Sequence, residues 1–279
     1  MIDSIKSLNA IAVISETNTK GSSPLFVIAE DDQEYFVKAS SVQPPKMELI
    51  NELICSYFLK CWNIQTPEIA LIKFDKQVVD AYTKEKGPLS WKYKSIDFEK
   101  EICFASRQIK PVIEFEKYIK GLGKKQDFHL FRRPLDFLKI GVFDIWVANK
   151  DRKPENPNIL VSGFGKFDFN PIDHAAAWGY LSHPMDITIP KLHLEEKFRI
   201  LNVPLSKSIA KFAKISELKE LQLEIHENIL TTLKYLDFIF EQVPKEWGLS
   251  DKGKNKIRHV LADNGRILSI SNSYLSYLK

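Results

Sequence analysis

Residues 149–160, NKDRKPENPNIL, decide how the rest of the chain is interpreted. In this run Asp151 is followed five positions later by Asn156, on a segment that also contains two prolines. Apolar residues recur at helical spacing over residues 135–149 and predict a buried helix, whereas residues 158–161 predict a short strand. The run therefore predicts a loop from which a carboxylate and an amide converge. A polar turn with asparagine caps is the alternative.

The spacing of Asp151 and Asn156 resembles the catalytic loop of protein kinases. There the Asp accepts the proton of the attacking hydroxyl, and the Asn oxygen helps to hold a magnesium ion. Residues 162–165, SGFG, predict a hairpin turn, and Asp173 follows at the end of the next strand, where kinases keep their principal magnesium ligand. We therefore expect metal ligands at Asp173 and Asn156, with Asn158 as the alternative to Asn156.

The N-terminal part predicts an antiparallel sheet. Residues 11–15, 25–29 and 34–39 are short runs rich in β-branched and aromatic residues, which is typical of strands. In the third run, Phe36 and Lys38 share one face because side chains alternate along a strand.

Helical spacing over residues 46–61 predicts one helix after this sheet, and residues 69–74 and 78–83 predict two further strands. Residues 204–240 and 252–278 alternate apolar and charged residues with a helical period. We expect an α+β, two-lobed, protein-kinase-like fold with an N-terminal ATP-binding lobe at residues 1–106 and a mainly helical catalytic lobe at residues 107–279.

Composition places the chain among ordinary globular proteins. It has 279 residues, 44% hydrophobic and 27% charged, and a net charge of +4 that is too small to indicate direct nucleic-acid binding. Cys55, Cys61 and Cys103 form no CxxC pair. Cys55 and Cys61 fall in a helical apolar pattern, which favours buried thiols over a disulfide or a zinc site. No leader peptide and no stretch of about eighteen apolar residues is found, so we expect a cytoplasmic protein without membrane contact.

Further motifs connect the chain to a family. It resembles the HipA-like kinases, in particular a compact branch without an extra N-terminal domain, over roughly residues 10 to 180. The motifs that carry the resemblance are GSSP at 21–24, YFVK at 35–38, NE at 51–52, FASR at 104–107, FDIW at 143–146, the run 149–158, and IDH at 172–174.

The resemblance implies roles for the residues around a bound ATP. Lys38 would contact its α- and β-phosphates, and Glu52 would pair with Lys38. On a helical wheel Glu52 points away from the apolar stripe, as a solvated residue would. Glu48 shares that face of the helix and is the alternative partner of Lys38. Phe104 and Ser106 are expected at the adenine pocket from their place in the order of elements.

A loop containing Gly21, Ser22 and Ser23 would cover the phosphates with backbone N–H groups. Some HipA-like kinases phosphorylate a serine in this loop, so autophosphorylation of Ser22 or Ser23 is a hypothesis. Lys153 would neutralise the transferred phosphate, and Arg152 is expected to anchor the catalytic loop.

The function expected from this resemblance is ATP- and magnesium-dependent phosphorylation of a serine or threonine in a protein. A small-molecule or lipid kinase is the alternative enzyme, and a non-catalytic nucleotide-binding module is the alternative class. Lys38, Asp151, Asn156 and Asp173 are all present, which argues against loss of activity. By resemblance alone, an antitoxin-type partner protein of a toxin–antitoxin pair is expected.

Overall fold

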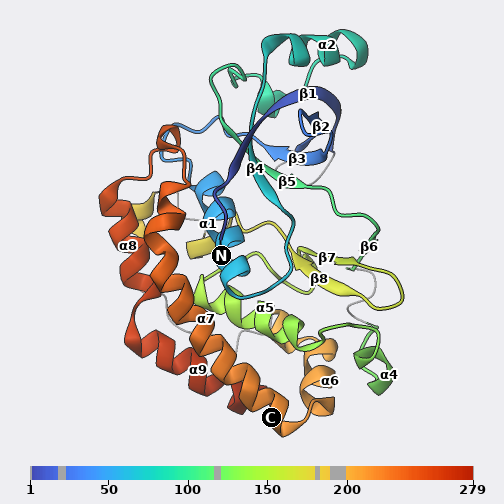
Figure 1. Cartoon of the computed structure of the whole chain (residues 1–279), viewed down its shortest axis with the longest axis vertical. Coiled ribbons are helices and arrows are strands. Elements are labelled where there is room, and N and C mark those ends of the chain that lie inside the picture. Colours follow the sequence, from blue (N-terminus) through green and yellow to red (C-terminus); the bar gives the residue numbers. More distant parts are fainter. Residues whose placement is uncertain (1, 18–22, 116–120, 180–182, 189–198, 279) are drawn as a thin grey trace.

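The computed structural model describes residues 2–17, 23–115, 121–179, 183–188 and 199–278 (Figure 1). Its main elements are β1 (Lys6–Glu16), β2 (Leu25–Ala29), β3 (Glu34–Lys38), α1 (Met47–Cys61), β4 (Ile69–Lys73), α2 (Lys76–Lys86), η1 (Trp91–Tyr93), β5 (Cys103–Arg107), β6 (Val112–Glu114), α4 (Lys125–Phe128), α5 (Leu135–Trp146), β7 (Ile159–Ser162), β8 (Asp168–Pro171), α6 (Pro204–Phe212), α7 (Ile215–Glu241), η5 (Lys245–Trp247), α8 (Asp251–Leu261) and α9 (Asn264–Leu278).

A closed barrel with the strand order β1-β2-β3-β5-β4 forms the upper part of Figure 1. Strands β1, β2 and β3 pair antiparallel, as predicted. The prediction of a purely antiparallel sheet is wrong where the barrel closes, because residues 6–9 of β1 pair in parallel with residues 70–73 of β4. Strand β1 begins before the predicted residues 11–15, and its pairing with β2 shifts register between Ala10 and Ala12 and between Val13 and Ser15.

Residues 78–83 are predicted as a strand but lie inside helix α2. Their β-branched residues favour a strand locally, yet Val78, Val79 and Tyr82 also recur at helical spacing. Val78 and Val79 pack against the core of the barrel, and Gly87, with φ of 92°, ends the helix. Packing on the barrel therefore outweighs local strand propensity.

Helices α1, α5, α6, α7, α8 and α9 contribute to one large hydrophobic core that is separate from the interior of the barrel. Trp62 after α1 stacks on Trp146 of α5 with ring centroids 5.4 Å apart. Nearly every residue of α1 is buried, since the barrel lies on one side of it and α7 on another. The predicted lobe boundary at residues 106 and 107 falls within β5 and stays a prediction.

A small sheet of β6, β7 and β8 lies beside α5 (Figure 1). Strands β7 and β8 form the predicted hairpin, and their first and last residues, Ile159 and Pro171, are paired. The backbone N–H of Ile172 donates to the carbonyl of Asn158 at 2.9 Å, which extends the pairing. The loop before β7 and the segment after β8 therefore leave from the same end of the hairpin.

The remaining expectations concern thiols and membranes. Cys55 and Cys103 are buried and Cys61 is half-buried, all three as free thiols. Burial raises the pKa of Cys61 to about 11 and that of Cys103 to about 12. Among the described residues, no helix is both long and apolar enough to cross a bilayer.

Candidate active site

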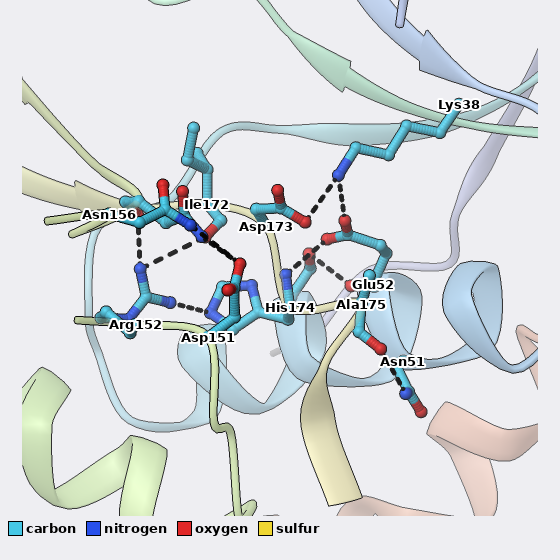
Figure 2. Close-up of polar contacts among 12 residues, drawn as sticks. Lys38, Asn51, Glu52, Asp151, Arg152, Asn156, Ile172, Asp173, His174 and Ala175 are labelled. Atoms are coloured by element: carbon cyan, nitrogen blue, oxygen red, sulfur yellow. Dashed lines mark hydrogen bonds and ion pairs between the residues drawn. The ribbon is translucent and has the colours of Figure 1, made fainter. Parts of the chain in front are cut away.

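The catalytic-loop candidate and the segment around Asp173 meet at the open end of the β7–β8 hairpin (Figure 2). Because paired strands hold the chain on both sides of a hairpin at a fixed separation, this end brings Asp151 and Asp173 into one region. Arg152 contacts both residues that flank Asp173, namely Ile172 and His174. Arg152 therefore joins the loop that carries Asp151 directly to the segment that carries Asp173.

Asp151 is held by neutral groups. The Nδ2 atoms of Asn156 and Asn158 donate to its Oδ2 at 2.9 and 3.1 Å, and its backbone N–H donates to Asn149 Oδ1 at 3.2 Å. The backbones of Lys153 and Asn156 exchange two hydrogen bonds, and the Lys153 side chain is exposed on this turn. Both asparagines suggested by the sequence therefore orient Asp151.

Arg152 is the anchor of the loop, as predicted. Its guanidinium is buried, and Nε donates to Asp144 Oδ2 on α5 at 2.7 Å. Its Nη1 donates to the carbonyls of Pro157, Asn158 and Ile172. Burial raises the pKa of Asp144, and Arg152 opposes that effect. The role of Asp144 was missed, although a buried acid within the FDIW motif was a visible signal.

His174 is part of this network rather than a metal ligand. Its ring is buried, and its Nε2 lies 2.8 Å from Arg152 Nη2. Burial and the neighbouring Arg152 lower the pKa of His174 well below its usual value, so the ring is neutral and Nε2 accepts from the guanidinium.

The second carboxylate, that of Asp173, forms an ion pair with Lys38. Lys38 Nζ on β3 contacts Glu52 Oε1 on α1 and lies 2.9 Å from Asp173 Oδ1 (Figure 2). Burial alone would lower the pKa of Lys38, but the two carboxylates raise it above its usual value. Burial alone would raise the pKa of Asp173, but Lys38 brings it below its usual value. Both groups are therefore held in their charged forms.

Glu52, not Glu48, is the partner of Lys38. Glu52 is 3% exposed, and its Oε2 accepts the backbone N–H of His174 at 3.0 Å, whereas Glu48 is exposed. The helical wheel was a poor guide here because α1 is buried on nearly every side. A buried acid on such a helix needs a partner, and Lys38 supplies it.

Asn51, beside Glu52 on α1, is a site residue to which the sequence assigned no role. Its buried Nδ2 donates to the carbonyls of Ala175 and Ala177 at 2.9 and 3.2 Å. Two consecutive residues of α1 therefore hold the segment after Asp173. The NE motif itself was the available signal.

The residues present fit a divalent cation. One ammonium, that of Lys38, faces the carboxylates of Glu52 and Asp173, so the cluster has an excess of negative charge. The asparagines turn their Nδ2 atoms toward Asp151, which leaves their oxygens directed elsewhere. In the described part of the chain, no three or more His, Cys, Asp or Glu side chains are grouped so that they could hold a metal by themselves. This donor set suits magnesium, which takes one or two carboxylates together with phosphates.

The remaining predicted site residues lie on or near the barrel. Phe36 and Lys38 are cross-strand partners of Ser106 and Phe104, so all four share one face of the sheet. Phe104 is buried in the large core, which is a packing position, whereas Ser106 is half-buried. Phe26 and Phe36, both half-buried, stack 4.9 Å apart on this same face and were missed as site candidates.

Gly21 and Ser22 lie outside the described residues, and Ser23 is buried at the start of the segment leading into β2. The phosphate-covering role of these three residues stays a prediction.

Comparison with one solved structure supports a kinase fold. The crystal structure of the Helicobacter pylori proinflammatory kinase CtkA matches with a TM-score of 0.56 at 10% identity, covering 98% of each chain. A Golgi casein kinase matches at a TM-score of 0.40 and 12% identity, covering 96% of this chain and 72% of its own. A search of curated protein sequences gave no match.

The family model described as HipA-like kinase matches residues 11–272, which is nearly the whole chain. It extends well beyond the region in which the sequence motifs were found. With a kinase-like α+β fold and a Lys–Glu–Asp cluster facing an Asp–Asn loop, the chain belongs to the HipA-like kinase family.

Proposed function

We propose that this chain is an ATP- and magnesium-dependent serine/threonine protein kinase. The observation that carries the proposal is the meeting of Lys38, Asp173 and Asp151 at the end of the β7–β8 hairpin. These three side chains supply a phosphate-binding cation, a metal-binding anion and a proton acceptor, which are the parts that phosphoryl transfer requires.

The nucleotide is proposed to lie against the barrel face that carries Lys38. The ammonium of Lys38, kept charged by Glu52, would bind the α- and β-phosphates. The stacked rings of Phe26 and Phe36 offer an apolar surface for adenine beside the half-buried Ser106. This assignment shifts the adenine contacts from Phe104, whose ring is packed in the core, to the aromatic pair.

Magnesium would be held by Asp173 together with the oxygen of Asn156 or Asn158. When bound, the ion neutralises phosphate charge and orients the phosphoryl group for in-line displacement. The carboxylate of Asp173 is bound by Lys38, whereas that of Asp151 is bound by Asn156 and Asn158. The two sides of the site therefore perform separate tasks.

In the transfer step, the acceptor hydroxyl oxygen forms a bond to the γ-phosphorus while the bond from that phosphorus to the ADP oxygen breaks. The hydroxyl proton passes to the Asp151 carboxylate, which the two asparagines hold in place. Lys153, exposed on the same turn, is proposed to neutralise the charge of the moving phosphoryl group.

A protein acceptor is proposed over a small molecule. Lys150 and Lys153 are exposed on the loop that carries Asp151, so an acceptor chain can reach Asp151 from solvent. Membership of the HipA-like kinases supports the same choice.

The proposal is tested with purified wild-type protein and the Asp151→Asn variant, using ATP labelled on the γ-phosphate. We expect magnesium-dependent turnover by the wild type only, and phosphoproteomics of cells expressing each form should show serine or threonine sites present only with the wild type. Label transfer to a small molecule without protein phosphorylation would contradict the protein-kinase assignment. No turnover by the wild type under any condition would contradict kinase activity itself.

A further inference from the structure

The first turn of α1 is bound by a segment from the C-terminal part of the chain. The short helix η5 lies between α7 and α8, and the carbonyl of its last residue, Trp247, accepts the backbone N–H of Lys46 at 2.9 Å. Lys46 is the residue at which α1 begins, since its own carbonyl accepts the N–H of Ile50 at 3.1 Å. Helix α1 is therefore tied at its start to η5.

Trp247 is itself held in place. Its side chain is fully buried, and its Nε1 donates to the carbonyl of Ile102, just before β5, at 2.9 Å. Its ring belongs to the large hydrophobic core that also contains the buried apolar residues of α1. Because the indole is packed on all sides and its donor has a partner, the Trp247 carbonyl is a fixed acceptor for Lys46.

The connection from β3 to α1 packs on the same segment. The side chain of Lys46 is buried, and its Nζ donates to the carbonyl of Ser40 at 3.1 Å and forms an ion pair with Glu101. Gly248, which follows Trp247, lies so close to Pro44 that a Cβ atom added to the glycine would be 2.7 Å from the Cβ of the proline. A backbone hydrogen bond, an ion pair and close packing therefore fix the start of α1.

The hold on Lys46 reaches the candidate active site through the helix. Glu52 follows Lys46 by six residues, which corresponds to about 9 Å along a helix. Because the hydrogen bonds of a helix keep its residues in a fixed relation, a displaced first turn would displace Glu52 as well. Glu52 contacts Lys38 Nζ and accepts the backbone N–H of His174, the residue next to Asp173 (Figure 2).

We propose that Trp247 is a positioning residue for the Lys38–Glu52 pair: through the first turn of α1 it sets where Glu52 meets Lys38. This inference rests on the proposed kinase function, in which Lys38 binds the phosphates. Lys38 lies on a strand of the barrel, whereas the buried apolar residues of α1 belong to the large core. The helical region therefore presents Glu52 to the barrel, and η5 fixes the position in which it does so.

The test displaces the start of α1 from η5 without changing Trp247. Gly248→Ala places a methyl group against Pro44, at a residue whose φ is 77°. Gly165→Ala is the matched control, because Gly165 has a φ of 73° and a Cβ atom added there would meet no described atom within 4 Å. Both variants strain a left-handed backbone, and only Gly248→Ala pushes on Pro44.

We expect Gly248→Ala to weaken the binding of magnesium–ATP, measured by calorimetry, by about three- to tenfold, as for the loss of one hydrogen bond. The kcat at saturating ATP should stay within about twofold of the wild type, because the groups that hold Asp151 remain in place. In hydrogen exchange, the amide of His174, whose acceptor is Glu52, should exchange faster. The amide of Ile172, whose acceptor is Asn158, should be unchanged. Gly165→Ala should match the wild type in ATP affinity and at His174.

Trp247→Phe is the second variant and decides the question if Gly248→Ala does not fold. It keeps an aromatic ring and the backbone carbonyl, and it removes the Nε1 donor to Ile102. It should change ATP affinity and His174 exchange in the same direction and by a smaller amount. Wild-type exchange at His174 in this variant would then overturn the inference.

Equal ATP affinities in Gly248→Ala and Gly165→Ala would also overturn it. Faster exchange at His174 and Ile172 alike would assign η5 a merely structural role, with the same consequence. If the wild type neither binds ATP nor turns it over, the kinase proposal fails by itself. Exchange then decides: faster exchange at His174 in Gly248→Ala but not in Gly165→Ala supports the hold of η5 on Glu52, and unchanged exchange overturns it.

Discussion

The two sides of the active site hold their carboxylates by different means. Asp151 is bound by the amides of Asn156 and Asn158, which carry no charge. Asp173 is bound by the ammonium of Lys38, which lowers its pKa. The amides fix the orientation of the Asp151 carboxylate, whereas the ammonium of Lys38 keeps Asp173 as an anion.

The two sides are linked through one buried group. Arg152 connects the loop of Asp151 to Asp144 on α5 and to both neighbours of Asp173. Helix α1 acts on the Asp173 side only, through Glu52 and Asn51. We therefore expect variants around Asp151 to impair the proposed proton transfer and variants around Asp173 to impair the proposed metal binding. Loss of Arg152 should impair both.

The largest expected effect is that of Asp151→Asn on the transfer step. Removing the proton acceptor should lower kcat by about a thousandfold, or about 4 kcal/mol, while leaving ATP affinity unchanged because the Asp173 side is intact. Steady-state turnover and nucleotide binding by calorimetry measure the two quantities. Asp168→Asn, which alters an ion pair of the hairpin with Arg132, is the control. A parallel loss of ATP affinity would contradict the separation of tasks.

Arg152→Met should come next, because it leaves Asp144 as a buried carboxylate without its cation. We expect the free energy of unfolding to fall by about 3–5 kcal/mol. The double variant Asp144→Asn, Arg152→Met should recover part of this loss. By contrast, Arg132→Met removes an exposed partner and should cost less than about 1 kcal/mol. Urea denaturation measures all of these variants, and equal costs for the two arginines would refute the linking role of Arg152.

Asn51→Ala should have a smaller effect that is confined to the Asp173 side. Loss of the donor to one buried and one partly buried carbonyl should cost about 2 kcal/mol of stability and raise the magnesium concentration needed for half-maximal turnover. Asn228→Ala is the matched control, since its amide donates to the carbonyl of Trp62 away from the site. An unchanged magnesium requirement in Asn51→Ala would show that Asn51 does not position Asp173.

The smallest effect should appear in the pH dependence of stability. The lowered pKa of Asp173 contributes stability that is present above its unfolded value of 3.8 and is lost as the pH falls through the lower folded value. The Lys38→Met variant removes the cause of this shift, so its unfolding free energy should depend less steeply on pH below about 4 than that of the wild type. Urea denaturation between about pH 2 and 5 checks this, and identical slopes would show that Lys38 does not hold Asp173 as an anion.

Local sequence patterns predicted the structure correctly where the residues of one segment alone determine it. The run from Asn149 to Leu160, the hairpin that follows it and the helix at 46–61 were all predicted from the order and periodicity of their own residues. The fold class followed from the same motifs. The error at 78–83 arose because a β-branched run is compatible with two structures, and contact with the barrel selects the helix.

The sequence by itself determined the family and the residue types of the site: Asp151, Asp173, Lys38 and Glu52 were named from motifs. Only the tertiary structure decided their partners, since a hydrogen bond or ion pair depends on the distance between atoms that the chain order does not specify. The preference for Glu52 over Glu48, the role of Asn51 and the hold of Trp247 on Lys46 all join different elements of the chain. The role of Asp144 joins helix α5 to the loop that follows it. Packing of α1 between the barrel and the helices, and the pairing of β7 with β8, bring these atoms within contact distance.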